Sequence, residues 1–109
     1  MMNDKKLLED LTTAAHRAYT RGLQTGSGGN LSARVSGTQT MMVKASGGSF
    51  ADCGTDGSNW MLTDFEGVPL PGQTEKPTRE ALLHGFLYSI LPSIGGIMHS
   101  HSPWSSVWA

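Results

Sequence analysis

His99 and His101 are the two residues whose type and spacing point most directly to chemistry. They follow an apolar run, residues 94–98, that predicts a buried β-strand. Alternate side chains of a strand point to the same side, so the two imidazoles are expected to face one site. Histidine nitrogens bind Zn²⁺ well, and the pair is therefore a candidate half of a metal site. The alternative to a metal site is that the spacing arises by chance and that one of the rings makes only a local hydrogen bond.

Glu80 is the carboxylate that the sequence offers to this pair. It lies 19 residues before His99, and Thr78 is expected to cap a helix whose first turn contains Glu80. His84 follows one helical turn later on the same face, which makes it a candidate third ligand. The interpretation that we favour is that His84 supports the site or packs against a neighbour.

Two turns of small residues are candidates for binding an anion. Residues 24–30 are Gly-rich and lead into a predicted strand at residues 31–35. Residues 45–48 follow a second predicted strand, at residues 40–44, and offer a hydroxyl and backbone N–H groups to the same anion. Gly-rich turns are also common as plain hairpin loops, so these patterns alone are weak.

The motifs in this order resemble the class II aldolase/adducin family. The resemblance rests on Gly-Gly-Asn-Leu-Ser-Ala-Arg at residues 28–34, Pro-Thr-Arg-Glu at residues 77–80, a short helix, and the His-x-His segment at residues 92–102. That family includes fuculose-phosphate and rhamnulose-phosphate aldolases and ribulose-phosphate 4-epimerases. It implies an α/β fold with a central, mainly antiparallel sheet flanked by helices, and residues 1–109 would form the amino-terminal part of one such domain.

The resemblance also implies a reaction and a metal site. His99 and His101 would be permanent ligands of Zn²⁺ or another divalent metal, which would stabilise the charge left when a ketose phosphate is cleaved at a carbon–carbon bond. Glu80 would be the acid/base, and a metal ligand when no substrate is bound. Arg79 departs from the small hydroxyl residue usual at its position, and it is either an anion contact or a surface salt-bridge partner. The residues implied to bind the phosphate are Gly29, Asn30, Ser46, Gly47, Thr78 and Arg79.

Three alternatives to an aldolase remain open. The segment around residues 93–96 is most similar to the 4-epimerases, although those enzymes have an aspartate where this chain has Glu80. The adducin branch uses the fold for protein association without a metal set. The family takes a third metal histidine from beyond the position of Ala109, so an inactive fragment, or a chain completed by a partner, is also compatible with the sequence. Family members form homotetramers, and a homo-oligomer is expected here.

Composition limits the other classes of function. A chain of 109 residues with a net charge of −1 has no basic surface for nucleic acid or anionic membranes. Cys53 is the single cysteine of the sequence, so we expect it to be a free thiol, as is usual in a reducing compartment. No apolar stretch is long enough to span a bilayer, and we therefore expect a cytoplasmic protein. Residues 4–22 are expected to form an amphipathic helix that ends at Gly22. The helix after Glu80 is expected to bury a broad apolar stripe made by Leu83, Phe86, Leu87, Ile90 and Leu91.

Overall fold

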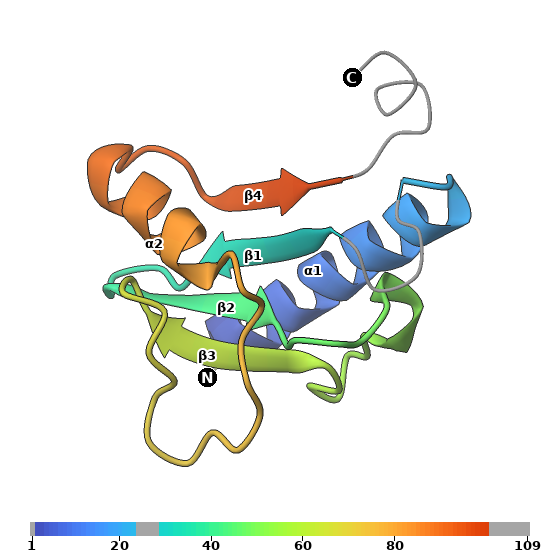
Figure 1. Ribbon diagram of the computed structural model, residues 1–109, viewed down its shortest axis with the longest axis horizontal. Coiled ribbons are helices and arrows are strands. Elements are labelled where there is room, and N and C mark those ends of the chain that lie inside the picture. Colours follow the sequence, from blue (N-terminus) through green and yellow to red (C-terminus); the bar gives the residue numbers. More distant parts are fainter. Residues whose placement is uncertain (1, 24–28, 101–109) are drawn as a thin grey trace.

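The computed structural model describes residues 2–23 and 29–100. Within them, four strands form one antiparallel sheet in the order β3-β2-β1-β4, with a helix on each face (Figure 1). The expected α/β architecture with a central antiparallel sheet is confirmed. The elements in chain order are α1 (Met2–Thr20), β1 (Asn30–Arg34), β2 (Thr40–Lys44), a 3-10 turn (Phe50–Asp52), β3 (Trp60–Asp64), α2 (Ala81–Ile90) and β4 (Gly96–His99).

Helix α1 forms where the amphipathic pattern over residues 4–22 predicts a helix. Leu11, Ala15 and Ala18 are buried on one side of the helix and pack against the sheet. The helix ends as expected at Gly22, whose φ of 73° is in the left-handed region that glycine adopts without strain. The N–H of Leu23 then donates to the carbonyl of Ala18 at 2.9 Å, which closes the last turn.

The side chains of strand β1 alternate between the two faces of the sheet. Leu31 and Ala33 point to the α1 side and belong to its apolar core. Asn30, Ser32 and Arg34 point to the α2 side, where each makes a side-chain hydrogen bond. The side of the sheet under α2 is therefore lined by polar groups along β1, and the candidate site lies on this side.

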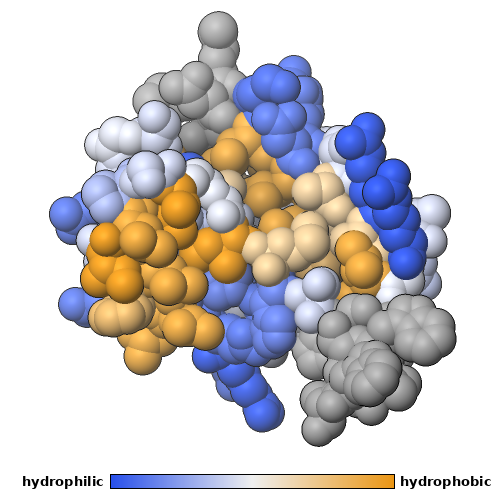
Figure 2. Space-filling model, turned by 90° about the horizontal axis from the view of Figure 1, so that it is seen from above, coloured by the Kyte–Doolittle hydropathy of each residue, from blue (hydrophilic) through white to orange (hydrophobic). Residues whose placement is uncertain are grey.

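The expected burial of α2 is wrong, because a different set of residues faces the sheet. The buried residues of α2 are Ala81, His84, Gly85 and Tyr88, which recur at helical spacing. A Cβ on Gly85 would lie 1.8 Å from the carbonyl oxygen of Phe65, so the helix packs closely through its smallest residue. The apolar patch over α2 in Figure 2 lies on the outside of the described residues, where large side chains are more than two-fifths exposed, namely Leu82, Leu83, Phe86, Ile90 and Leu91.

Strand β4 also differs from the expectation of a buried strand. It is an edge strand of the described sheet, paired only with β1, and Met98 is 41% exposed. Its register with β1 places His99 opposite Asn30 and Ile97 opposite Ser32. Ser102 and Pro103 predict the N-cap and first position of a further helix, and these residues lie outside the described part of the chain. Among the described helices, none has the length and apolar character needed to cross a membrane.

Candidate active site

Glu80 and His99 meet on the α2 side of the sheet. The Oε2 atom of Glu80 lies 2.7 Å from Nδ1 of His99, and both side chains are about two-fifths exposed. Strand pairing sets the position of His99 beside Asn30, and the packing of α2 on β1 brings the start of the helix to the same place. An acid and an imidazole that are 19 residues apart in sequence therefore share one solvent-accessible corner.

The local backbone at Glu80 differs by one step from the expected helix start. Glu80 itself occupies the N-cap position of α2, and its side chain makes no capping hydrogen bond. Thr78, which was expected to be the cap, lies two residues before the N-cap position. Its backbone carbonyl accepts a hydrogen bond from the N–H of Ala81 at 3.1 Å. Because the carboxylate is not used as a cap, it is directed toward His99.

Asn30 and His84 support this pair from below. The amide oxygen of Asn30 accepts a hydrogen bond from Nε2 of His84, while its amide nitrogen lies 3.5 Å from Nδ1 of His99. His84 is 1% exposed and also contacts the hydroxyl of Ser32 at 2.6 Å. This geometry agrees with a supporting role for His84 and not with the alternative of a third metal ligand, because both ring nitrogens face protein groups.

The surroundings favour an ionised Glu80. Burial acts to raise the pKa of the Glu80 carboxyl, but hydrogen bonds from His99 and Asn30 outweigh burial and lower it. Burial lowers the pKa of His84, which keeps that ring neutral. An ionised carboxylate next to a neutral buried histidine can accept a proton from a bound molecule.

The turn at Ser46 and Gly47 lies beside the segment that leads to Glu80. The N–H of Ser46 donates to the carbonyl of Lys76 at 2.7 Å, and the N–H of Thr78 donates to the carbonyl of Lys44 at 3.2 Å. Gly29, with a φ of 82°, immediately precedes Asn30 at the start of β1. Gly29 is therefore next to Asn30 of the site, and the Ser46–Gly47 turn is next to the segment at residues 76–78 that precedes Glu80.

Arg79 and Lys44 have contrasting environments. Arg79 is exposed and lines the same shallow surface as Glu80 and Phe86. Lys44 is 1% exposed, its ammonium donates to the carbonyl of Ala45 at 3.1 Å, and burial lowers its pKa. Sequence patterning assigned Lys44 only to the end of a strand, since nothing in a strand pattern distinguishes a buried lysine from a surface one.

The predicted metal site is described only in part. His101 lies outside the described residues, so the expected pairing with His99 stays a prediction. Among residues 2–23 and 29–100, no group of three histidine, cysteine or acidic side chains is close enough to hold a metal ion. The described donors are thus one imidazole and one carboxylate.

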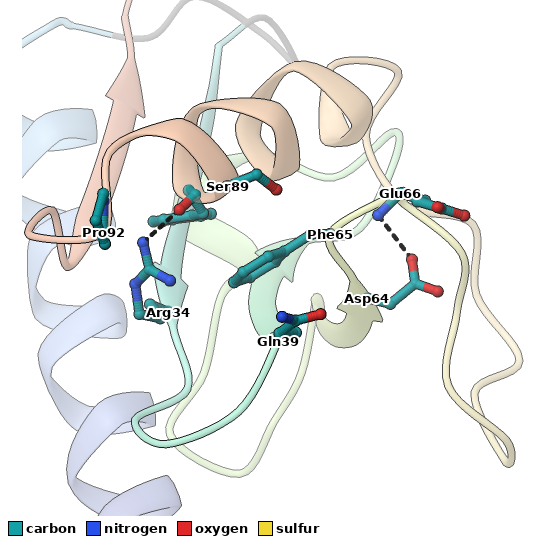
Figure 3. Close-up of a pocket in the computed structure, with 8 residues that line it drawn as sticks. Arg34, Gln39, Asp64, Phe65, Glu66, Ser89 and Pro92 are labelled. Carbon is teal, nitrogen blue, oxygen red and sulfur yellow. Dashed lines mark hydrogen bonds between the residues drawn. The ribbon is translucent and has the colours of Figure 1, made fainter.

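A separate hollow of about 490 Å³ lies near the other end of β1, away from Asn30. Arg34 dominates it (Figure 3): the guanidinium points to the carboxyl end of α2 and donates to the carbonyl of Tyr88 at 2.8 Å. It lies 5.2 Å from the centre of the Phe65 ring and 5.0 Å from that of Tyr88. The carboxylate of Asp64 at the rim accepts hydrogen bonds from the N–H groups of Glu66 and Val68. The hydrogen bonds of Arg34 and Asp64 in this hollow therefore connect parts of the protein, and we assign the hollow no role in the candidate site.

Comparisons with known proteins agree with the fold. Residues 9–109 match the family model described as Class II Aldolase and Adducin N-terminal domain. The chain is 35% identical over 102 residues to a methylthioribulose-1-phosphate dehydratase of Pseudomonas savastanoi pv. phaseolicola, a match that covers 93% of this chain and 48% of the relative. The chain thus spans about half the length of the curated relatives that it matches.

Two solved structures show the same architecture. An L-fuculose 1-phosphate aldolase superposes with a TM-score of 0.79 at 24% identity, covering 94% of this chain and 47% of that one. The L-fuculose 1-phosphate aldolase from Glaciozyma antarctica superposes with a TM-score of 0.84 at 20% identity, covering 95% and 43%. At these identities the likeness concerns the fold.

Proposed function

Because this chain belongs to the class II aldolase/adducin family, we propose that it carries the acid–base group and part of the metal site of a zinc-dependent lyase acting on a ketose 1-phosphate. The observation that carries the proposal is the 2.7 Å contact between Glu80 Oε2 and His99 Nδ1. It joins a group that can move a proton to a group that can bind a metal, and both are reachable from solvent.

The donor chemistry fits a zinc ion. Imidazole nitrogen and carboxylate oxygen are both ligands that Zn²⁺ accepts. Nδ1 of His99 faces the carboxylate of Glu80, and ligating histidines commonly direct their other N–H to a carboxylate, so Nε2 is the nitrogen that would bind the ion. His99 and His101 would hold the ion, and Glu80 would become a further ligand in the absence of substrate by moving from Nδ1 of His99 to the ion. When bound, the ion supplies Lewis-acid polarisation of the ketose carbonyl.

Glu80 would carry the proton transfer. In the dehydration of a ketose, a base takes a proton from the carbon next to the carbonyl, and the hydroxyl of the following carbon leaves as water. The ionised carboxylate of Glu80 would accept that proton and return it to the departing hydroxyl, so that one group serves both halves of the reaction. Asn30, which donates to the carboxylate of Glu80, would hold it in place.

The residues around Glu80 would bind the substrate phosphate. The N–H of Gly47 and the hydroxyl of Ser46 would supply neutral donors, and Arg79 supplies an exposed positive charge beside Glu80. The other groups in this role are Gly29, Asn30 and Thr78.

Dehydration is the reaction that we favour. The support is the 35% identity to a methylthioribulose-1-phosphate dehydratase. Aldol cleavage is the second candidate, because fuculose 1-phosphate aldolases share the fold. Both reactions need a polarised ketose carbonyl and one mobile proton, so the Glu80–His99 pair suits either.

The products distinguish these reactions. The protein that carries this sequence would be incubated with zinc and, separately, methylthioribulose 1-phosphate and fuculose 1-phosphate, and the products analysed by mass spectrometry. Loss of water from the first substrate supports dehydration, whereas release of an aldehyde from the second supports aldol cleavage. Inversion at one carbon without a change of mass would instead indicate an epimerase. No turnover of either compound would contradict the proposal and favour an association role.

Glu80→Gln tests the assigned acid/base. The substitution keeps the size of the side chain and removes its ability to accept a proton, so we expect turnover to fall by about 10²- to 10⁴-fold. Glu75→Gln is the matched control, since Glu75 is exposed in the loop before Glu80 and its replacement should leave turnover unchanged. Retention of activity within about tenfold in Glu80→Gln would contradict the role of Glu80 as acid/base.

A further inference from the structure

A buried chain of hydrogen bonds runs beneath the Glu80–His99 pair. The hydroxyl of Tyr88 contacts the hydroxyl of Ser32 at 2.8 Å, and Ser32 contacts Nδ1 of His84 at 2.6 Å. Nε2 of His84 contacts the amide oxygen of Asn30, whose amide nitrogen faces the site. His84, Ser32 and Tyr88 are each at most 1% exposed, so solvent does not compete for these contacts.

The donors and acceptors of this chain allow one assignment. The amide oxygen of Asn30 only accepts, so Nε2 of His84 must carry the proton. In the neutral ring Nδ1 then accepts, and the Ser32 hydroxyl donates to it. Ser32 has one proton to give, so Tyr88 donates to Ser32. Every hydrogen bond from Tyr88 to Asn30 therefore runs in the same direction.

We propose that His84 is a positioning residue for the candidate site, which fixes the side-chain amide of Asn30 with its oxygen inward and its NH₂ group toward Glu80 and His99. A reversed amide would turn its oxygen toward the carboxylate of Glu80, where two acceptors would face each other. Held as it is, the NH₂ group donates to Glu80 and orients the carboxylate. The effect on catalysis rests on the proposed function; the orientation of the amide does not.

Two substitutions of His84 separate positioning from packing. The amide nitrogen of glutamine lies about as far along the side chain as Nε2 of histidine, whereas that of asparagine lies about as far as Nδ1. His84→Gln therefore keeps a donor for Asn30, and His84→Asn keeps only the contact with Ser32. We expect kcat/KM to fall by about 10- to 100-fold in His84→Asn, the range seen for residues that orient metal-site groups, and to recover largely in His84→Gln.

Thr12→Val controls for loss of stability. It removes a buried hydrogen bond from Trp60 Nε1 at 3.1 Å on the opposite side of the sheet, so it should lower the melting temperature without changing kcat/KM. Equal losses of activity in His84→Asn and His84→Gln, or no loss in either, would overturn the assigned role of His84.

Nuclear magnetic resonance tests the orientation without any substrate. In ¹⁵N-labelled protein, the ring nitrogens of His84 should report a proton on Nε2 and a hydrogen-bonded, unprotonated Nδ1. The side-chain NH₂ resonances of Asn30 should shift in Glu80→Gln. A proton on Nδ1 of His84, or Asn30 resonances that do not respond to Glu80→Gln, would overturn the proposal. If the protein has no ketose-phosphate activity, this measurement still decides the orientation while the proposed function fails separately.

Discussion

Gly85 is a residue at which the addition of a single methyl group should strongly destabilise the fold. A methyl group there would meet the carbonyl oxygen of Phe65 at 1.8 Å and the carbonyl carbon at 2.4 Å, and neither backbone atom can move without displacing the end of β3. We expect Gly85→Ala to lower the free energy of unfolding by about 2–4 kcal/mol, measured by urea denaturation.

Gly95→Ala is the matched control for Gly85. Nothing lies within 4 Å of a Cβ at Gly95, so the free energy of unfolding should change by less than about 1 kcal/mol. If both variants were equally stable, α2 would not pack as closely on the loop at Phe65 as the structure indicates.

Cys53 should react slowly for reasons of burial alone. Its side chain is 3% exposed, and burial raises the pKa of its thiol to about 11. Since only the thiolate is nucleophilic, alkylation by iodoacetamide at pH 8 should be on the order of 100-fold slower than in guanidinium, and the rate should rise with pH toward 11. Equal rates in native and unfolded protein would contradict the burial of Cys53.

At the scale of single residues, the sequence predicted part of the site. Glu80 and His99 were found from residue type and family resemblance, and the structure brings them together. Ser32 and Tyr88 were missed, because a serine in a strand and a tyrosine in a helix carry no local sign of a shared histidine. The detectable signal was the alternation of polar residues at positions 30, 32 and 34, all facing α2.

At the scale of elements, Arg34 links the end of β1 to the end of α2. Its guanidinium donates to the carbonyl of Tyr88, in the last turn of the helix, at 2.8 Å and to that of Leu91, the C-cap residue, at 3.2 Å. It also lies beside the Phe65 and Tyr88 rings, which stack on each other with their centres 5.6 Å apart. Arg34 thereby keeps α2, and with it Glu80, in position on the sheet.

Arg34→Lys tests this link. An ammonium cannot reproduce the planar fork or its stacking, so we expect the free energy of unfolding to fall by about 1–3 kcal/mol. Arg21→Lys, at an exposed position after α1, should be neutral within about 0.5 kcal/mol. Both are read from thermal melts followed by circular dichroism. An unchanged melting temperature in Arg34→Lys would show that α2 is held without this cap.

The local sequence pattern predicted where the helices and strands lie better than it predicted how they pack. The strand at Thr40–Lys44 and the end of α1 at Gly22 follow directly from alternation and glycine chemistry. The buried face of α2 was mispredicted because large apolar side chains were assumed to face inward. The close approach of Gly85 to Phe65 selects the other face, and this is a tertiary contact that no helical periodicity reveals.

At the scale of the whole molecule, the sheet has two unlike sides. The α1 side holds the larger apolar core, which includes Phe50 and Trp60. The α2 side holds a smaller cluster with Met41 and Tyr88, together with the polar network that ends at Glu80 and His99. The family fold, antiparallel and helix-flanked, was predictable from four ordered motifs, whereas the place of β4 at the edge of the described sheet was not, since strand periodicity says nothing of sheet order.

The measurement that tests the central claim most directly is zinc binding by the protein that carries this sequence. Titration calorimetry gives the affinity for zinc, and elemental analysis gives the zinc content. We expect near-stoichiometric zinc in the unaltered protein and in Thr12→Val, and loss of zinc in the His99→Ala/His101→Ala double variant. Glu80→Gln should retain zinc while losing turnover. Zinc that is absent from the unaltered protein, or unaffected by removal of both histidines, would contradict a metal site built on His99.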